Sequence, residues 1–123
     1  MSSSIFEITK AATFDAAHRL PNGPNPTYTR LHGHSFRVEA TVRGEATGPI
    51  GWVEDLGALD AALRAAAAEL DHVLLNEVPG LESPTLEHLC EHFAGRLKPA
   101  FPGLARIVVS RPSVGESCAM AVV

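Results

Sequence analysis

The stretch Leu31-His32-Gly33-His34-Ser35-Phe36-Arg37-Val38-Glu39-Ala40-Thr41-Val42-Arg43 decides the fold. From Phe36 onward, apolar and polar residues alternate, which is the pattern of a β-strand with one buried face. His32 and His34 share the parity of the apolar positions, so both rings are expected on the buried face. The segment 5–20 alternates in the same way and carries His18 on its apolar face, with Lys10 as the exception. The sequence therefore predicts three imidazoles on the apolar faces of two neighbouring strands.

Histidines on an apolar face need partners, because burying an unpaired polar group costs about 2–7 kcal/mol. A shared metal ion provides them, and three neutral histidines with one open coordination position are typical of a catalytic zinc. The alternative for the H-x-H pair alone is that its rings are core histidines with backbone partners. The third histidine, with matching parity on the preceding strand, favours the metal. We therefore predict a zinc site formed by His18, His32 and His34.

The composition is that of a soluble globular protein, with 46% apolar and 20% charged residues. Its 123 residues suit a single domain, 1–123. The net charge of −4 gives no reason to expect nucleic acid or an anionic membrane as a partner, although a small anionic substrate is not excluded. Two cysteines do not make a disulfide framework, and neither a signal peptide nor a membrane span is visible. We expect a cytoplasmic protein.

Two helices are predicted in the second half of the chain. Asp55 is a suitable N-cap for the first helix, whose apolar stripe runs from Leu56 to Leu70. The second helix is expected to open at Ser83-Pro84, with serine as the cap and proline at the first helical position, and to end at Lys98-Pro99.

Two closing strands, 106–111 and 115–123, are predicted around Pro112. The expected architecture is an α+β domain, an antiparallel four-stranded sheet with both helices on one face. Such a sheet leaves its edge strands unpaired, and exposed edges are commonly covered by another chain. The sequence therefore also predicts a homo-oligomer.

The second predicted helix contains His88-Leu89-Cys90-Glu91-His92, which matches the H-x-x-E-H pattern of one class of zinc peptidase. Both histidines would share one helical face with a carboxylate. They lie off the apolar stripe, however, as residues of a solvated face do, and no third ligand follows. We therefore disfavour a peptidase and assign Cys90 to the core.

Five segments in a fixed order cover nearly the whole chain. They are Phe14-Asp15-Ala16-Ala17-His18-Arg19-Leu20, Arg30-Leu31-His32-Gly33-His34-Ser35-Phe36, Gly51-Trp52-Val53-Glu54-Asp55-Leu56, Leu70-Asp71-His72-Val73-Leu74-Leu75-Asn76 and Pro79-Gly80-Leu81-Glu82-Ser83-Pro84-Thr85-Leu86-Glu87. Together they resemble the 6-pyruvoyl-tetrahydropterin synthase and 6-carboxy-tetrahydropterin synthase family. The resemblance implies the tunnelling fold (T-fold), in which subunits join their sheets into a barrel and two trimers stack as a hexamer. It also implies a zinc ion on the three histidines and a pterin bound near subunit interfaces.

The resemblance further implies the chemistry. In this family zinc polarises oxygens of the pterin side chain, and a cysteine, an aspartate and a histidine move protons. Asp71 and His72 match the last two. A carboxylate that orients an imidazole makes a proton shuttle near neutral pH. The alternative for these two residues is purely structural, a turn-forming aspartate and a histidine at the end of a helix.

Two positions depart from the family pattern. Tyr28 stands where the family carries the cysteine, and a phenol, with an ordinary pKa near 10, is about 1.5 units less acidic than a thiol. Arg111 stands where the family usually carries a glutamate that pairs with the amino-pyrimidinone edge of the pterin, and a guanidinium offers only donors.

Arg111 shares the parity of Ile107 and Val109, so it is expected to point inward and to have a partner. Its alternative role is a salt bridge at a subunit contact. Glu116, five residues on, is a candidate to compensate for the missing glutamate, and Thr85 completes the expected substrate-binding set.

Three functions remain open from the sequence. The leading one is a zinc-dependent lyase or isomerase that acts on the side chain of 7,8-dihydroneopterin triphosphate or a related pterin. The second is a family member that acts on a different heterocycle, with Arg111 in place of the recognition carboxylate. The third is a non-catalytic zinc-containing binding protein.

Overall fold

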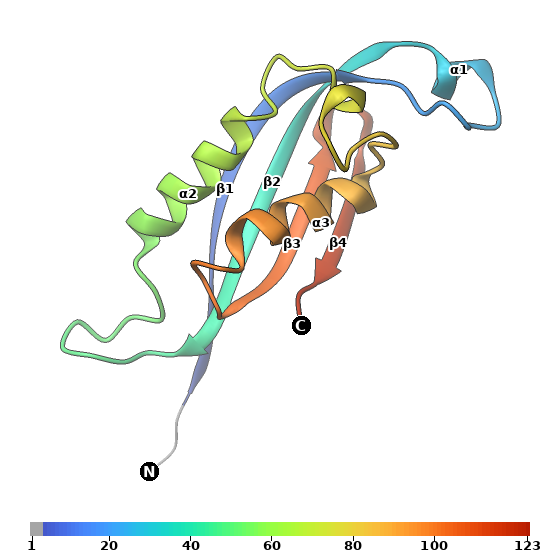
Figure 1. Ribbon diagram of the computed structural model, residues 1–123. Helices are drawn as coiled ribbons and strands as arrows, with labels where there is room; N and C mark the ends of the chain where they lie inside the picture. Colours follow the sequence, from blue (N-terminus) through green and yellow to red (C-terminus); the bar gives the residue numbers. More distant parts are fainter. Residues whose placement is uncertain (1–3) are drawn as a thin grey trace.

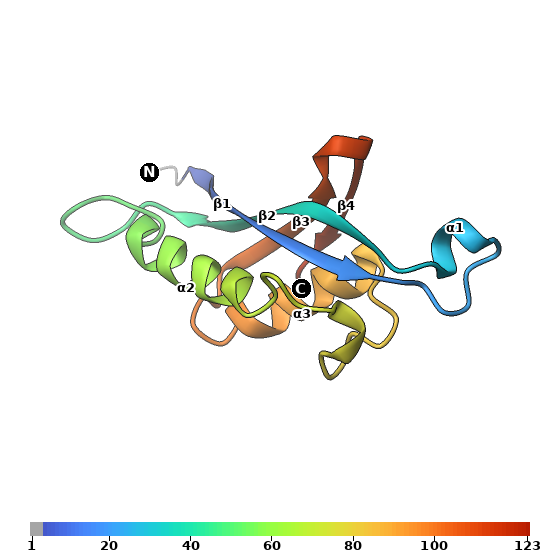
Figure 2. The ribbon, with the colours of Figure 1, turned by 90° about the horizontal axis from the view of Figure 1, so that it is seen from above.

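The computed structural model describes residues 4–123 and contains one antiparallel sheet with strand order β1-β2-β3-β4 (Figure 1). The strands are β1 (Ile5–His18), β2 (His32–Glu45), β3 (Leu104–Arg111) and β4 (Glu116–Ala121). Two helices, α2 (Leu56–Ala68) and α3 (Leu86–Leu97), cover the same face of the sheet, as the view from above shows (Figure 2). Three short turns of helix complete the chain, namely α1 (Pro26–Thr29), η1 (Leu75–Glu77) and η2 (Pro112–Val114). The predicted α+β architecture is confirmed.

The hairpin of β1 and β2 fixes the register on which the site depends. The two strands pair continuously from Ile5 opposite Glu45 to His18 opposite His32. This register stacks the rings of Phe14 and Phe36, with centroids 5.0 Å apart. Both phenylalanines are buried under the helices, and the histidines lie beyond them on the same face, toward the end of the sheet.

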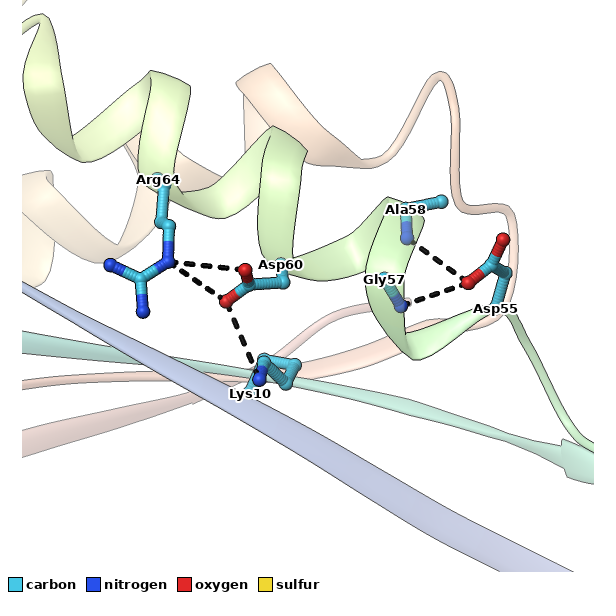
Figure 3. A network of polar contacts seen from close by, with 6 residues as sticks. All are labelled: Lys10, Asp55, Gly57, Ala58, Asp60 and Arg64. Atoms are coloured by element: carbon cyan, nitrogen blue, oxygen red, sulfur yellow. Dashed lines mark hydrogen bonds and ion pairs between the residues drawn. The ribbon is translucent and has the colours of Figure 1, made fainter.

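Lys10, the exception in the alternation of β1, is explained by the helix above it. Its Nζ lies 3.4 Å from the Asp60 carboxylate on α2, which also accepts from Arg64 one turn further along (Figure 3). The predicted N-cap of α2 is confirmed in the same view, where Asp55 accepts hydrogen bonds from the backbone N–H groups of Gly57 and Ala58.

The second long helix begins later than predicted. Its N-cap is Thr85, whose hydroxyl accepts from the backbone N–H of His88, so Ser83 is not the cap and Pro84 lies outside the helix. The physical reason is a tight turn before the helix, in which the backbone N–H of Thr85 donates to the Ser83 carbonyl (2.9 Å). The Ser83 carbonyl also faces the His88 ring, and the Pro84 carbonyl faces His18. The prediction of Cys90 in the core is confirmed.

The outer edge of β1 is partly covered. Residues 71–74 run along its C-terminal half, where the backbone N–H of His72 donates to the Asp15 carbonyl (2.6 Å) and that of Ala17 donates to the Val73 carbonyl (3.1 Å). The rest of this edge and the outer edge of β4 pair with no other strand of residues 4–123. Within that range, no helix has the length and apolar character needed to cross a membrane.

Candidate functional site

Three histidines meet at one end of the sheet, beneath the start of α3. His18 ends β1, His32 begins β2 directly opposite, and His34 follows two residues later on the same face. Their potential ligand atoms all lie within 4.8 Å of one another. His18 is fully buried, and the other two are half-buried. We call this cluster, a candidate metal site, the metal centre.

The hydrogen bonds of the outer ring nitrogens settle which nitrogens face inward. Nδ1 of His18 lies 3.3 Å from the Pro84 carbonyl, and Nδ1 of His32 lies 2.7 Å from the Arg30 carbonyl. A carbonyl only accepts, so in each neutral ring Nδ1 carries the hydrogen and Nε2 presents a lone pair. The two Nε2 atoms are 3.1 Å apart. Two lone pairs at this distance repel each other unless a cation lies between them.

A zinc ion fits this donor set. Nitrogens at 2.0–2.1 Å from a tetrahedral zinc stand about 3.3 Å apart, close to the separation of the two Nε2 atoms. Backbone carbonyls that fix the orientation of ligand rings are a common outer shell of such sites. The residues present therefore suit a zinc ion with three nitrogen ligands and one position left for substrate or water.

Burial and neighbouring charges favour the neutral, metal-binding form of His18 and His34. Burial, then the charges of His32, Arg111 and His34, lower the pKa of His18 to about 4, although the hydrogen bond that His18 donates to the Pro84 carbonyl raises it. Burial, followed by the charge of Arg111, also lowers the pKa of His34. Both rings are accordingly uncharged at neutral pH, and a metal ion displaces no proton from them.

Asp71 and His72 form a hydrogen-bonded pair on the edge of β1. Nδ1 of His72 lies 2.9 Å from Oδ2 of Asp71, whose other oxygen accepts from the backbone N–H of Asp15 at 2.9 Å. These bonds raise the pKa of His72 and lower that of Asp71, the latter chiefly through the Asp15 N–H. His72 also has a φ of +58°, which is unusual for a residue other than glycine and is a feature of functional sites.

An open cleft of about 730 Å³ adjoins both groups, since His72 and His34 belong to its lining. Asp15 and Ser35 line it too, and the Ser35 hydroxyl donates to Asp15 at 2.6 Å. Neither residue was predicted as part of the site, although Asp15 and Ser35 belong to the motifs that carry the family resemblance and face each other in the β1–β2 register. The cleft is large enough for a bicyclic heterocycle.

Comparisons with known proteins agree with this geometry. The model of the 6-pyruvoyl tetrahydropterin synthase family matches residues 7–122. The chain belongs to this family. The 6-carboxy-5,6,7,8-tetrahydropterin synthase of Synechocystis is 41% identical over an alignment of 108 positions that covers 83% of each chain. The dihydroneopterin monophosphate aldolase of Pyrococcus furiosus is 34% identical over 96 residues, 78% of each chain.

The fold of the family is also recognised in three dimensions. The structure of Caenorhabditis elegans 6-pyruvoyl tetrahydropterin synthase matches with a TM-score of 0.83 over the whole of both chains, at 20% identity. The 6-pyruvoyl tetrahydropterin synthase of Plasmodium falciparum matches with a TM-score of 0.71 at 17% identity, over 98% of this chain and 100% of that one. The predicted T-fold is therefore confirmed for the single chain.

The two residues that depart from the family pattern lie in different surroundings. Tyr28 is on α1 and is 44% exposed, and no hydrogen bond within residues 4–123 joins its hydroxyl to His72 or to the metal centre. Arg111 points inward, as predicted, and pairs across strands with Glu116. Its Nε lies 2.9 Å from Oε1 of Glu116, so the salt bridge forms within the chain.

Thr85 caps α3, directly after Pro84, whose carbonyl contacts His18. This places the third predicted substrate-binding residue beside the metal centre.

The H-x-x-E-H residues differ from the expected solvated face in one respect. His88 is exposed, but His92 is half-buried and its Nε2 has no partner within residues 4–123. Among those residues, the metal centre is the one group whose geometry suits a metal ion.

Proposed function

We propose that this member of the family is a zinc-dependent lyase or isomerase that acts on the side chain of 7,8-dihydroneopterin triphosphate or a related pterin. The observation that carries the proposal is the pair of Nε2 lone pairs, 3.1 Å apart, in rings whose Nδ1 atoms are fixed by carbonyls. The names of the relatives, a tetrahydropterin synthase and a dihydroneopterin monophosphate aldolase, support the substrate class.

When bound, a zinc ion supplies Lewis acidity toward oxygens of the pterin side chain, which makes the neighbouring C–H group more acidic. The chain itself supplies the proton transfer. Asp71 holds the Nδ1–H tautomer of His72, which leaves Nε2 of His72 free to take a proton from the side chain and to return one. In this proposal Tyr28 is a weaker acid or a substrate contact at the position of the missing cysteine.

We also propose that the active form is a homo-oligomer, a hexamer built as a dimer of trimers. The uncovered part of the β1 edge and the outer edge of β4 support sheet pairing between copies. The Asp71–His72 pair lies on the β1 edge with the His72 side chain 78% exposed, so a neighbouring copy would bury it. An open cleft shared with His34 supports a site completed at such an interface.

A second candidate function is a family member that acts on a different heterocycle. The observation that favours it is Arg111, which provides donors at the position where the resemblance expects an accepting carboxylate. In that case the metal and the proton-transfer pair keep their roles while the recognised ring differs.

Metal analysis of purified variants tests the zinc site. We expect one zinc ion per chain in the wild type, and loss of stoichiometric zinc in both His32→Ala and His34→Ala. His88→Ala is the matched control, because it removes an exposed histidine of the H-x-x-E-H pattern and should retain the metal. Full zinc retention in both cluster variants would contradict the assignment.

An activity assay with 7,8-dihydroneopterin triphosphate tests the reaction. We expect turnover by the zinc-loaded wild type and loss of turnover in the same two variants.

A further inference from the structure

The guanidinium of Arg111 is short of acceptors although it is largely buried. Its side chain is 14% exposed, and the approach of Glu116 at 2.9 Å does not align with the N–H, so the buried Nε has no hydrogen-bond partner within residues 4–123. None of the hydrogen bonds found in this part of the chain uses the other guanidinium nitrogens either. A buried donor without an acceptor costs about 1–3 kcal/mol, more when it is charged.

Arg111 lies next to the metal centre. Its strand places it on the same face as the buried residues Ile107 and Val109, and Glu116 is its direct partner on β4. Ser110 pairs with Arg37 on β2, so the strand register carries Arg111 toward Phe36, which lies two residues from His34 on the same face. A metal cation and a guanidinium side by side leave an excess of positive charge that the single carboxylate of Glu116 does not balance.

The chemistry of a guanidinium restricts what it recognises. It presents donors in a planar fork and accepts nothing, so it pairs with a carboxylate or a phosphate, often through two parallel bonds. It cannot receive the N–H groups of an amino-pyrimidinone. The position therefore selects for an anionic group, whichever ring bears it.

We propose that Arg111 is a specificity-determining residue that holds an anionic group of the substrate, a carboxylate or a phosphate, beside the metal centre. This inference rests on the proposed function, because it names the substrate class of the same site. Arg111 binds and orients the ligand and transfers no proton. Glu116 pairs with the guanidinium from β4, and the unpaired donors are left to the ligand.

Calorimetric binding to the zinc-loaded protein tests the proposal with two pairs of fully oxidised pterins. Pterin-6-carboxylate against pterin probes a carboxylate on the ring, and neopterin triphosphate against neopterin probes a phosphate on the side chain. We expect the wild type to bind the anionic member of at least one pair about 10- to 100-fold more tightly, as a charge-assisted contact provides. The pair that shows the preference identifies the anionic group as a carboxylate on the ring or a phosphate on the side chain.

Three variants separate the role of Arg111 from general effects. Arg111→Gln should abolish the preference, and Arg111→Lys, which keeps the charge without the fork, should retain part of it. Arg106→Gln is the matched control, an exposed arginine on the same strand, and should keep the full preference. Thermal melting and zinc content verify that each variant is folded and loaded. The preference should also shrink at high salt because ions screen the contact.

Several results would overturn the inference. They are equal binding of charged and neutral probes by the wild type, an unchanged preference in Arg111→Gln, and no binding of any probe. It would also fail if Glu116→Gln removed pterin binding while Arg111→Gln kept the preference, since Glu116 would then be the anchor. Failure of the proposed function looks different. In that case the wild type binds anionic pterins through Arg111 but turns over neither 7,8-dihydroneopterin triphosphate nor related dihydropterins.

Discussion

At the scale of single residues, the partner of one ring nitrogen decides what the other nitrogen of a histidine can do. In His18 and His32, backbone carbonyls accept hydrogen bonds from Nδ1–H, which leaves both Nε2 lone pairs available to a metal. In His72, a carboxylate accepts the hydrogen bond from Nδ1–H, and the charge of this carboxylate stabilises the protonated ring. One residue type thus supplies neutral ligands at one place and a basic imidazole at another.

The electrostatic environment of His72 predicts its titration. The hydrogen bond and charge of Asp71 raise its pKa above the ordinary value of 6.5, so Asp71→Asn should lower it toward that value. We expect this shift when the ring carbon signals of His72 are followed by NMR against pH. Because the folded-state pKa is raised, the stabilisation from His72 is complete below the unfolded pKa and is lost as pH rises through the folded value. An unchanged His72 titration in Asp71→Asn would contradict the pairing.

At the scale of elements, the strand pairing of β1 with β2 and the capping of α2 position the site. The register sets His18 against His32, and the helices cover the neighbouring phenylalanines Phe14 and Phe36. The N-cap at Asp55 satisfies two backbone donors at the start of α2. That helix leads directly into the Asp71–His72 turn, so its stability bears on the position of the proton-transfer pair.

Removing this cap should destabilise the fold without touching the site. We expect Asp55→Ala to reduce the free energy of unfolding by about 0.5–2 kcal/mol, because the N–H groups of Gly57 and Ala58 lose their acceptor. Urea denaturation of the isolated variant measures the loss. Asp55→Asn, which keeps an accepting oxygen, is the control and should restore most of the stability. Equal losses in both variants would show that the cap is not the cause.

At the scale of the whole molecule, the two chemical groups of the proposed site occupy different parts of the sheet. The metal centre faces the helices, and the Asp71–His72 pair sits on the β1 edge. The charges of Asp71 and Asp15 raise the pKa of His72. Sheet pairing through the β1 edge would bring His72 to a neighbouring copy, so we expect a complete site to draw on two subunits.

Mixed oligomers test this expectation. His34→Ala alone should lose activity with its metal, and His72→Ala alone should fall by about 10²–10⁴-fold. Refolding the two variants together in equal amounts should recover about one quarter of wild-type activity, since one site in four then combines two intact halves. No recovery would mean that each subunit completes its own site. Light scattering that returns a monomer mass would contradict the oligomer itself.

The sequence by itself determined the two hairpin strands, the parity of the three histidines, the cap at Asp55 and the family. These features are local, because side-chain alternation and capping depend on residues a few positions apart. The inward direction of Arg111 followed from the same alternation. The family resemblance added Asp71 and His72, whose hydrogen-bonded pairing the structure then displayed.

Only the tertiary structure decided what depends on contacts between distant segments. The N-cap of α3 is Thr85 and not Ser83, because the chain turns tightly at Pro84 and the carbonyls of Ser83 and Pro84 meet the rings of His88 and His18. The pairing of Arg111 with Glu116 needed the β3–β4 register. The inward Nε2 lone pairs of the metal centre required backbone carbonyls outside the strands to fix the rings. Such partners are set by how the chain packs in space, and no periodicity along a strand or helix encodes them.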